Sequence, residues 1–195
     1  MKLIVISKEK VFAGEPLWIN ALMGKYDFTF HLRKPGLTES ETEEIILQIN
    51  SNFHNRIVLH DHFPLAAKYR PKGVHLNSRN PEANFKGEYW NRCSISRSCH
   101  SLEEVAANKD SCNYVTLSPV FDSISKAGYK SGFTAEQLMR ASEEGIIDNK
   151  TIALGGVTLE HIPYLRQLNF GGVAMIGGIY NPEGVEKLKN WNRNK

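Results

Sequence analysis

Cysteine is scarce in this sequence, and its three cysteines, Cys93, Cys99 and Cys112, form no CxxC pair. An odd number of thiols without such a pair argues against a disulfide framework, so we expect a cytoplasmic protein. The apolar run over residues 2–7 is too short for a signal peptide. No stretch approaches the roughly 20 apolar residues that a membrane helix needs, and no membrane partner is expected.

An excess of charge of one sign is also lacking, because 24 basic residues and 21 acidic residues leave a net charge of only +3. This balance argues against a nucleic-acid partner and is compatible with a small anionic substrate. No GxGxxG fingerprint follows the first apolar run, and no low-complexity stretch or linker is present. With 195 residues, 41% of them hydrophobic, the chain is expected to form one domain over residues 1–195.

What the sequence does contain is a series of short apolar runs separated by mostly helical segments. The predicted strands are residues 2–7, 27–32, 56–59, 73–76, 90–95, 112–117, 151–154 and 172–176. Thr38 and Ser101 each begin a capping box typical of a helix start, whereas the segment 80–88 has little helical periodicity. Eight alternating βα units favour an α/β fold, a compact single-domain TIM (β/α)8 barrel, over an open doubly wound sheet.

Paired glycines follow the last two predicted strands, at Gly155-Gly156 and, directly after Ile176, at Gly177-Gly178. Paired glycines let the backbone turn sharply and approach a ligand closely. The free N–H groups at the start of a following helix bind anions, and in a (β/α)8 barrel this combination forms a phosphate cup. The alternative is that the glycines only form tight turns between strand and helix.

Cationic and polar side chains follow the other predicted strands, and in a barrel these positions meet at one rim. They are Arg33, Lys34, His60, Asp61, His62, His75, Asn77, Arg79, Ser98, His100, Ser118, Ser123, Ser125 and Lys126. Several cations beside a phosphate cup predict a small-molecule substrate that carries more than one phosphate. Asp61 is expected to bind Mg²⁺, an ion that prefers oxygen ligands, with pairing to an arginine as the alternative.

The histidines allow more than one interpretation. His60, His62 and His75 could form a zinc site, although no HxxxH-like spacing supports it, and structural or substrate contacts are favoured instead. His31 lies within the second predicted strand and is expected to form hydrogen bonds in the core or at the rim. Lys126 lies in a glycine-rich loop, from which it is expected to reach a phosphate.

Several of these segments resemble motifs of the thiamine-phosphate synthase and TenI-like family, in the same order along nearly the whole chain. The resembling segments are His31-Leu32-Arg33, His60-Asp61-His62, Gly73-Val74-His75-Leu76, 98–104, 118–126, 153–157 and 172–176. The resemblance implies a TIM barrel and a transferase of thiamine biosynthesis. Such an enzyme joins hydroxymethylpyrimidine diphosphate to thiazole phosphate, uses Mg²⁺ and releases pyrophosphate.

The resemblance also implies roles for individual residues. Arg33, Ser98 and Lys126 are the predicted catalytic residues, which hold the leaving pyrophosphate, and Asp61 and Asn80 are the predicted Mg²⁺ ligands. The predicted substrate-binding and phosphate-binding residues are His31, Lys34, His60, His100, Ser123, Ser125, Gly155, Gly156, Ile176, Gly177 and Gly178.

The chain departs from the synthase motifs at three positions: Pro35 replaces a lysine, Asn80 a carboxylate and Gly177 a serine. Pro119 stands where the thiazole tautomerases of the TenI-like branch have their proposed acid–base histidine, and proline cannot transfer a proton. Two alternatives to the synthase therefore stay open. They are a tautomerase that uses another base and a catalytically silent phosphate-binding barrel that regulates the thiamine pathway. The oligomeric state, with a homo-oligomer as one alternative, is also left open.

Overall fold

The structure is a computed structural model of residues 1–195, and it describes all of them except 84–85, 123–130, 177–178, 181 and 194–195. Its strands are β1 (Lys2–Ile6), β2 (Thr29–Leu32), β3 (Ile57–Leu59), β4 (Gly73–Leu76), β5 (Ser94–Cys99), β6 (Tyr114–Leu117), β7 (Thr151–Ala153) and β8 (Gly172–Met175). Its α-helices are α1 (Glu15–Lys25), α2 (Glu39–Gln48), α3 (Pro64–Tyr69), α4 (Leu102–Asn108), α5 (Ala135–Glu143), α6 (Ile162–Gln167) and α7 (Pro182–Arg193). Three short 3₁₀ helices, η1 (Ser51–Arg56), η2 (Lys109–Ser111) and η3 (Leu159–His161), complete the described elements.

The strands are hydrogen-bonded in the order β1 to β8 and form a closed barrel. The pairs β2–β3, β3–β4, β5–β6, β6–β7 and β7–β8 are parallel. For example, Phe30 of β2 lies opposite Ile57 of β3, and Val115 of β6 lies opposite Thr151 of β7. A parallel strand order that follows the sequence, with a helix after most strands, is the TIM (β/α)8 barrel, so the predicted fold class is confirmed.

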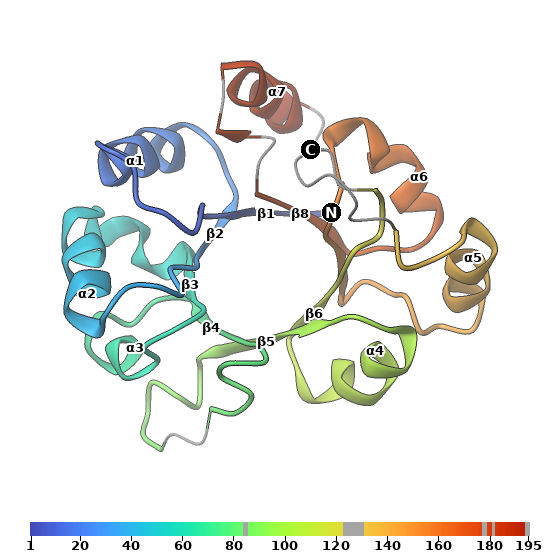
Figure 1. Cartoon of the computed structure of the whole chain (residues 1–195), viewed down its shortest axis with the longest axis horizontal. Coiled ribbons are helices and arrows are strands. Elements are labelled where there is room, and N and C mark those ends of the chain that lie inside the picture. Colours follow the sequence, from blue (N-terminus) through green and yellow to red (C-terminus); the bar gives the residue numbers. More distant parts are fainter. Residues whose placement is uncertain (84–85, 123–130, 177–178, 181, 194–195) are drawn as a thin grey trace. The chain divides into compact units, whose positions relative to one another are not determined.

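The chain groups into two compact units, Val5–Ile95 and Met1–Ile4 with Ser96–Lys195, and each is described by itself. That residues 1–195 form one domain stays a prediction. In the first unit, helices α1, α2 and α3 lie on the outer side of strands β2 to β4 (Figure 1). In the second unit, β6 pairs with both β5 and β7, and α4 and α5 follow β5 and β6 along the chain.

Side-chain caps fix where two of the longer helices begin. At the start of α2, Glu41 N–H donates to Thr38 Oγ1 (3.3 Å) and Thr38 N–H donates to a Glu41 carboxylate oxygen (2.8 Å), which confirms the predicted capping box. Thr134 and Gln137 form the same reciprocal pair at the start of α5. These caps satisfy backbone N–H groups that a helix start leaves without partners.

The segment before the fifth strand differs from its prediction. The strand is Ser94–Cys99, whereas the sequence predicted 90–95, because the aromatic signal of Trp90 belongs to a turn in which its ring packs edge-on against Tyr89 (5.1 Å). The real strand is mostly polar and buries only Ser96 and Cys99 completely, so its apolar signal is weak. The described residues between β4 and β5 form turns and bends, and none of them is helical.

Among the residues that the structure describes, no helix combines the length and the apolar character needed to cross a membrane.

Candidate active site

Asp61, the predicted Mg²⁺ ligand, lies in the bend directly after β3 and contacts the loop that follows β4. Its Oδ1 accepts hydrogen bonds from Arg79 Nε (3.1 Å), Arg79 Nη2 (3.0 Å) and Asn80 Nδ2 (3.1 Å). Its Oδ2 is buried and has no hydrogen-bond partner among the described residues. One carboxylate oxygen therefore serves the arginine pair that was the alternative interpretation, and the other accepts no hydrogen bond from the described residues.

The loop that carries Arg79 and Asn80 is held in place by Asn77. The Asn77 Oδ1 accepts hydrogen bonds from the backbone N–H groups of Arg79 (3.0 Å) and Asn80 (3.2 Å), which is the local turn that asparagine favours. Its amide nitrogen donates to the carbonyl oxygens of His60 (2.9 Å) and His75 (3.1 Å). The structure thus brings Asp61 and Asn80 together as predicted, with the Asn80 amide nitrogen facing the carboxylate. Binding of Mg²⁺ by the pair stays a prediction.

Three histidines from adjacent strands meet in the same unit. Nδ1 of His31 lies 2.8 Å from Nε2 of His60, and the rings of His60 and His75 stack at 4.3 Å. All three side chains are buried, with exposed fractions of 0%, 4% and 1%. The zinc interpretation named His62 as the third member, which is wrong: Nε2 of His62 instead lies 2.8 Å from the carbonyl oxygen of Leu37.

Burial decides the charge of these rings. Desolvation lowers the pKa of His31 well below its ordinary value, and the charges of His75 and Lys72 lower it further. Desolvation likewise lowers the pKa of His60, with His75, His31, Arg33 and Arg79 adding to the effect. Both rings are therefore neutral at neutral pH.

The lowered pKa values predict a loss of stability in mild acid. In the unfolded chain a histidine binds a proton below about pH 6.5, whereas His31 and His60 in the folded protein do not until the pH is lower. The unfolded state then binds more protons, so the free energy of unfolding falls as the pH drops below that value, by up to about 1.4 kcal/mol per pH unit for each histidine. Urea unfolding between pH 7.5 and 5.5 measures this slope. An unchanged midpoint over that range would contradict it.

Arg33 and Lys34, predicted to bind phosphate, have different environments. The backbone N–H of Arg33 donates to Ser7 Oγ (2.7 Å), and its guanidinium donates to Glu9 at 2.6 Å in a partly exposed ion pair. The Lys34 ammonium is 1% exposed and donates to Glu15 (2.7 Å), whose carboxylate is 0% exposed. It also donates to the carbonyl oxygens of Lys8 and Lys10. A buried ion pair thus occupies the Lys34 ammonium, and phosphate binding by Lys34 stays a prediction.

Ser98 and His100 lie at the end of β5 in the second unit. Ser98 is part of the strand, opposite Thr116 of β6, and does not lie in a loop as the predicted boundaries required. His100 is exposed; its backbone N–H donates to Glu104 (2.6 Å), and its Nδ1 lies 3.1 Å from the carbonyl oxygen of Ser118. Neither contact tests a role in substrate binding.

The glycine pair after β7 is needed by the fold itself. Gly155 and Gly156 have φ values of +85° and +64°, and a Cβ atom at Gly156 would lie 2.3 Å from the carbonyl oxygen of Asp122. A Cβ atom at Gly155 would lie 2.7 Å from the Cα of Pro119. The loop after β6 therefore approaches this turn too closely for any side chain, which fits the tight-turn alternative. Phosphate binding here stays a prediction.

This close approach predicts a measurable cost for Gly156→Ala. Gly145 has a similar φ of +70° but nothing within 4 Å of a Cβ position, so Gly145→Ala is a matched control for backbone strain alone. We expect Gly156→Ala to lower the free energy of unfolding by roughly 1–3 kcal/mol more than Gly145→Ala, the usual cost of overpacking. If urea unfolding showed the same loss of unfolding free energy in both variants, the loop after β6 would be able to move away from Gly156 at no cost.

For the remaining predicted site residues the structure gives little or no geometry. Ser123, Ser125, Lys126, Gly177 and Gly178 lie outside the described residues. Ile176, which follows β8, is exposed.

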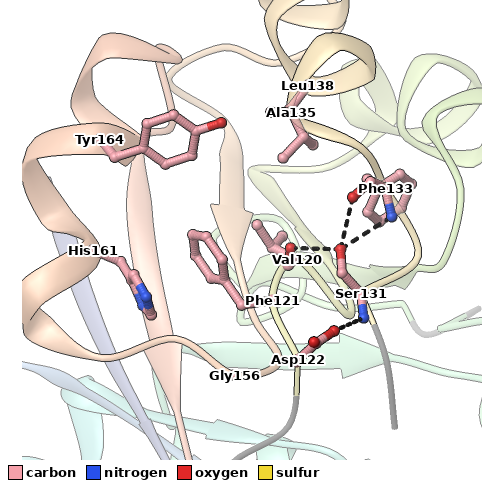
Figure 2. A pocket seen from close by; sticks show the side chains of 10 residues that line it. All are labelled: Val120, Phe121, Asp122, Ser131, Phe133, Ala135, Leu138, Gly156, His161 and Tyr164. Carbon is pink, nitrogen blue, oxygen red and sulfur yellow. Dashed lines mark hydrogen bonds between the residues drawn. The ribbon is translucent and has the colours of Figure 1, made fainter.

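A pocket of about 550 Å³ in the second unit was missed by the sequence analysis. Figure 2 shows its lining: Val120, Phe121, Asp122, Ser131, Phe133, Ala135, Leu138, Gly156, His161 and Tyr164. Phe121 stacks on His161 at 3.9 Å, and Ser131 Oγ donates to the Val120 carbonyl oxygen (2.9 Å). Val120, Phe121, Asp122 and Gly156 lie in two of the segments that resemble family motifs, and Gly156 was a predicted phosphate-binding residue. The other lining residues lie in 131–138 and 161–164, where no sequence pattern indicated a site.

Together the closed barrel and the polar side chains at its strand ends define a (β/α)8-barrel enzyme, since this class builds its active site from the segments that follow the strands. The chain belongs to the family described as thiamine monophosphate synthase, whose sequence model matches residues 4–179. Members of this family that are named thiamine-phosphate synthase are transferases.

Individual relatives agree with this assignment. The chain is 29% identical over 179 residues to the thiamine-phosphate synthase of Photorhabdus laumondii, covering 89% of this chain and 80% of that protein. It is 32% identical to a crystal structure of thiamine phosphate pyrophosphorylase from Bacteroides thetaiotaomicron, with a TM-score of 0.82 and coverage of 97% and 98%. The pyrophosphorylase of Pyrococcus furiosus, at 21% identity, a TM-score of 0.71 and coverage of 99% and 94%, supports the fold.

Proposed function

We propose that this chain is a thiamine-phosphate synthase, a transferase that joins hydroxymethylpyrimidine diphosphate to thiazole phosphate and releases pyrophosphate. The observation that carries the proposal is the family match over residues 4–179, which spans every strand from β2 to β8. The site geometry adds Asp61, with one oxygen held by Arg79 and Asn80 and the other buried without a hydrogen bond among the described residues.

The reaction breaks the bond between the pyrimidine methylene carbon and the diphosphate oxygen, and the electron pair leaves with pyrophosphate. The thiazole nitrogen then gives its lone pair to that carbon and forms the new C–N bond. Negative charge thus develops on the leaving group, and fixed cations nearby lower the barrier. We assign this stabilisation to the cations of Arg33 and Lys126 and to the Ser98 hydroxyl, which can donate a hydrogen bond to the leaving group.

Arg33 is suited to this role because its present partner is replaceable. Its guanidinium pairs with the exposed carboxylate of Glu9, and exposed ion pairs contribute only about 0–1 kcal/mol. A pyrophosphate can accept two parallel hydrogen bonds from the same guanidinium, which is the stronger arrangement. Substrate binding would therefore exchange Glu9 for phosphate at little cost.

The residues around Asp61 fit a magnesium ion. A buried carboxylate oxygen without a hydrogen bond among the described residues is costly unless a cation or a ligand satisfies it. Asp61 would supply one oxygen, Asn80 would orient it or add its amide oxygen, and the substrate diphosphate would supply the rest, as is common for Mg²⁺. Bound there, Mg²⁺ would neutralise charge on the diphosphate.

We also propose a cytoplasmic location and a single domain over residues 1–195. Cys93, Cys99 and Cys112 are all free and buried, an arrangement that suits a reducing compartment. The substrates are small phosphorylated molecules, and no nucleic-acid partner is proposed.

Product formation tests the proposed function. Purified protein incubated with both substrates and Mg²⁺ should form thiamine phosphate, and reactions that lack either substrate serve as controls. Isomerisation of a thiazole carboxylate phosphate without any joined product would favour the tautomerase. Binding of thiazole phosphate without turnover would favour the silent barrel.

A further inference from the structure

The buried histidine cluster is defined here as His31, His60 and His75. The strand register explains how it forms: His31 pairs with Val58, and Val58 pairs with Gly73, so the alternate positions His60 and His75 project from the same face of β2–β4. Phe30, Leu59 and Val74 occupy the opposite face. The cluster therefore follows from the register of three strands in one unit.

The composition of the cluster is unusual for a protein core. Three imidazoles carry six ring nitrogens, and buried nitrogens must be satisfied by hydrogen bonds or by a metal ion. One ligand atom of each histidine lies within 4.8 Å of the ligand atoms of the other two. This convergence of lone-pair donors exceeds what packing alone requires, because an apolar side chain would fill the same space without a polar group to satisfy.

We propose that the histidine cluster binds a divalent transition-metal ion of the zinc type. Imidazole nitrogens suit Zn²⁺, Co²⁺, Ni²⁺ and Cu²⁺, whereas Mg²⁺ prefers oxygen, so this site is chemically separate from the one at Asp61. Zinc–nitrogen bonds of about 2.0–2.1 Å need donor atoms roughly 3.3 Å apart in a tetrahedron. The present spacing, from 2.8 Å between His31 and His60 to at most 4.8 Å, reaches that value with small ring rotations.

Burial and support around the cluster agree with this assignment. The side chains of His31, His60 and His75 are only 0%, 4% and 1% exposed. Asn77 donates to the carbonyl oxygens of His60 (2.9 Å) and His75 (3.1 Å) and so ties together the chain segments that carry the two stacked rings. Such outer contacts orient metal ligands. Three protein ligands leave a fourth coordination position open.

Cobalt binding tests the proposal without any substrate, so its outcome does not depend on the proposed synthase activity. Metal-free protein is dialysed to equilibrium against Co²⁺, because an ion needs local opening to reach a buried site. We expect one Co²⁺ per chain, a visible absorption typical of nitrogen ligation in a four-coordinate site, and a raised melting temperature. His75→Gln should weaken binding by roughly 100-fold or more, since changes even to outer contacts cost 10–100-fold.

His62→Asn is the matched control. It removes the histidine next to Asp61 that lies outside the cluster, and asparagine tolerates the φ of +52° found there. This variant should bind Co²⁺ as the parent protein does. Weaker binding by His62→Asn together with unchanged binding by His75→Gln would overturn the proposal.

A second measurement covers the case in which His75→Gln does not fold. In ¹⁵N spectra of the parent protein, Zn²⁺ should shift one ring nitrogen of each of three histidines. Shifts at fewer than three rings, or no metal uptake by the folded parent protein, would mean that the cluster is only a hydrogen-bonded group of histidines.

Discussion

Asp61→Asn is expected to lower kcat for pyrophosphate release by about 100-fold or more, the loss typical of removing one stabiliser of charge in a transition state. The substitution changes almost no volume. It removes the negative charge that would hold Mg²⁺ against the diphosphate, and the need for that ion is greatest as the bond breaks. The measurement is steady-state turnover at saturating substrates.

Stability should change little in the same variant. Asparagine keeps a side-chain oxygen that can accept from Arg79, and because the Arg79 side chain is 39% exposed, against 12% for Asp61, solvent partly screens the charge that is lost. Asp110→Asn, at an exposed position in η2, is the control for removing a carboxylate and should keep full turnover. A lower melting temperature with unchanged kcat in Asp61→Asn would show that Asp61 only pairs with Arg79.

Lys34→Met is expected to lower the free energy of unfolding by about 3–5 kcal/mol, the range for breaking a buried ion pair. Both Glu15 carboxylate oxygens accept hydrogen bonds from the Lys34 ammonium, at 2.8 and 2.7 Å, and Glu15 is 0% exposed. Without Lys34 the carboxylate is left as a buried charge. Adding Glu15→Leu should recover most of the loss, since replacing both partners by apolar groups is often neutral.

Lys68→Met is the matched control, because it removes the exposed ion pair of Lys68 with Glu43 (2.6 Å). Its cost in urea unfolding should be small compared with that of Lys34→Met, because solvent screens an exposed pair. If Lys34→Met were as stable as the parent protein and instead raised the KM of a phosphorylated substrate, the predicted phosphate role of Lys34 would be supported over a structural one.

The fold could be predicted from the sequence because, for most strands and helices, the local sequence pattern agrees with the element that the barrel contains. The apolar run 73–76 coincides with β4, and the capping box at Thr38 marks the start of α2. The fifth strand was misplaced because its residues are mostly polar, whereas the preceding turn carries Trp90. Apolar content alone cannot identify a strand that buries small polar side chains.

The candidate site was only partly predictable. Asp61 and Asn80 were predicted to lie together because the family resemblance places a metal ligand at each position, and Asn80 Nδ2 lies 3.1 Å from Asp61 Oδ1. The partner of Lys34 is Glu15 in α1, a tertiary contact that no local pattern encodes.

The inclusion of His31 in the histidine cluster depends on strand register, because a shift of one residue would move every side chain of the strand to the opposite face. Gly156 was predicted to contact a phosphate, whereas the atom closest to its Cβ position is a backbone oxygen of the protein itself.

The rate of pyrophosphate release, measured with and without thiazole phosphate, tests the proposed synthase activity most directly. In the presence of Mg²⁺ and hydroxymethylpyrimidine diphosphate, we expect release that depends on thiazole phosphate and yields one thiamine phosphate for each pyrophosphate. Release that is no greater with thiazole phosphate than without it would contradict the assignment of this chain as a thiamine-phosphate synthase.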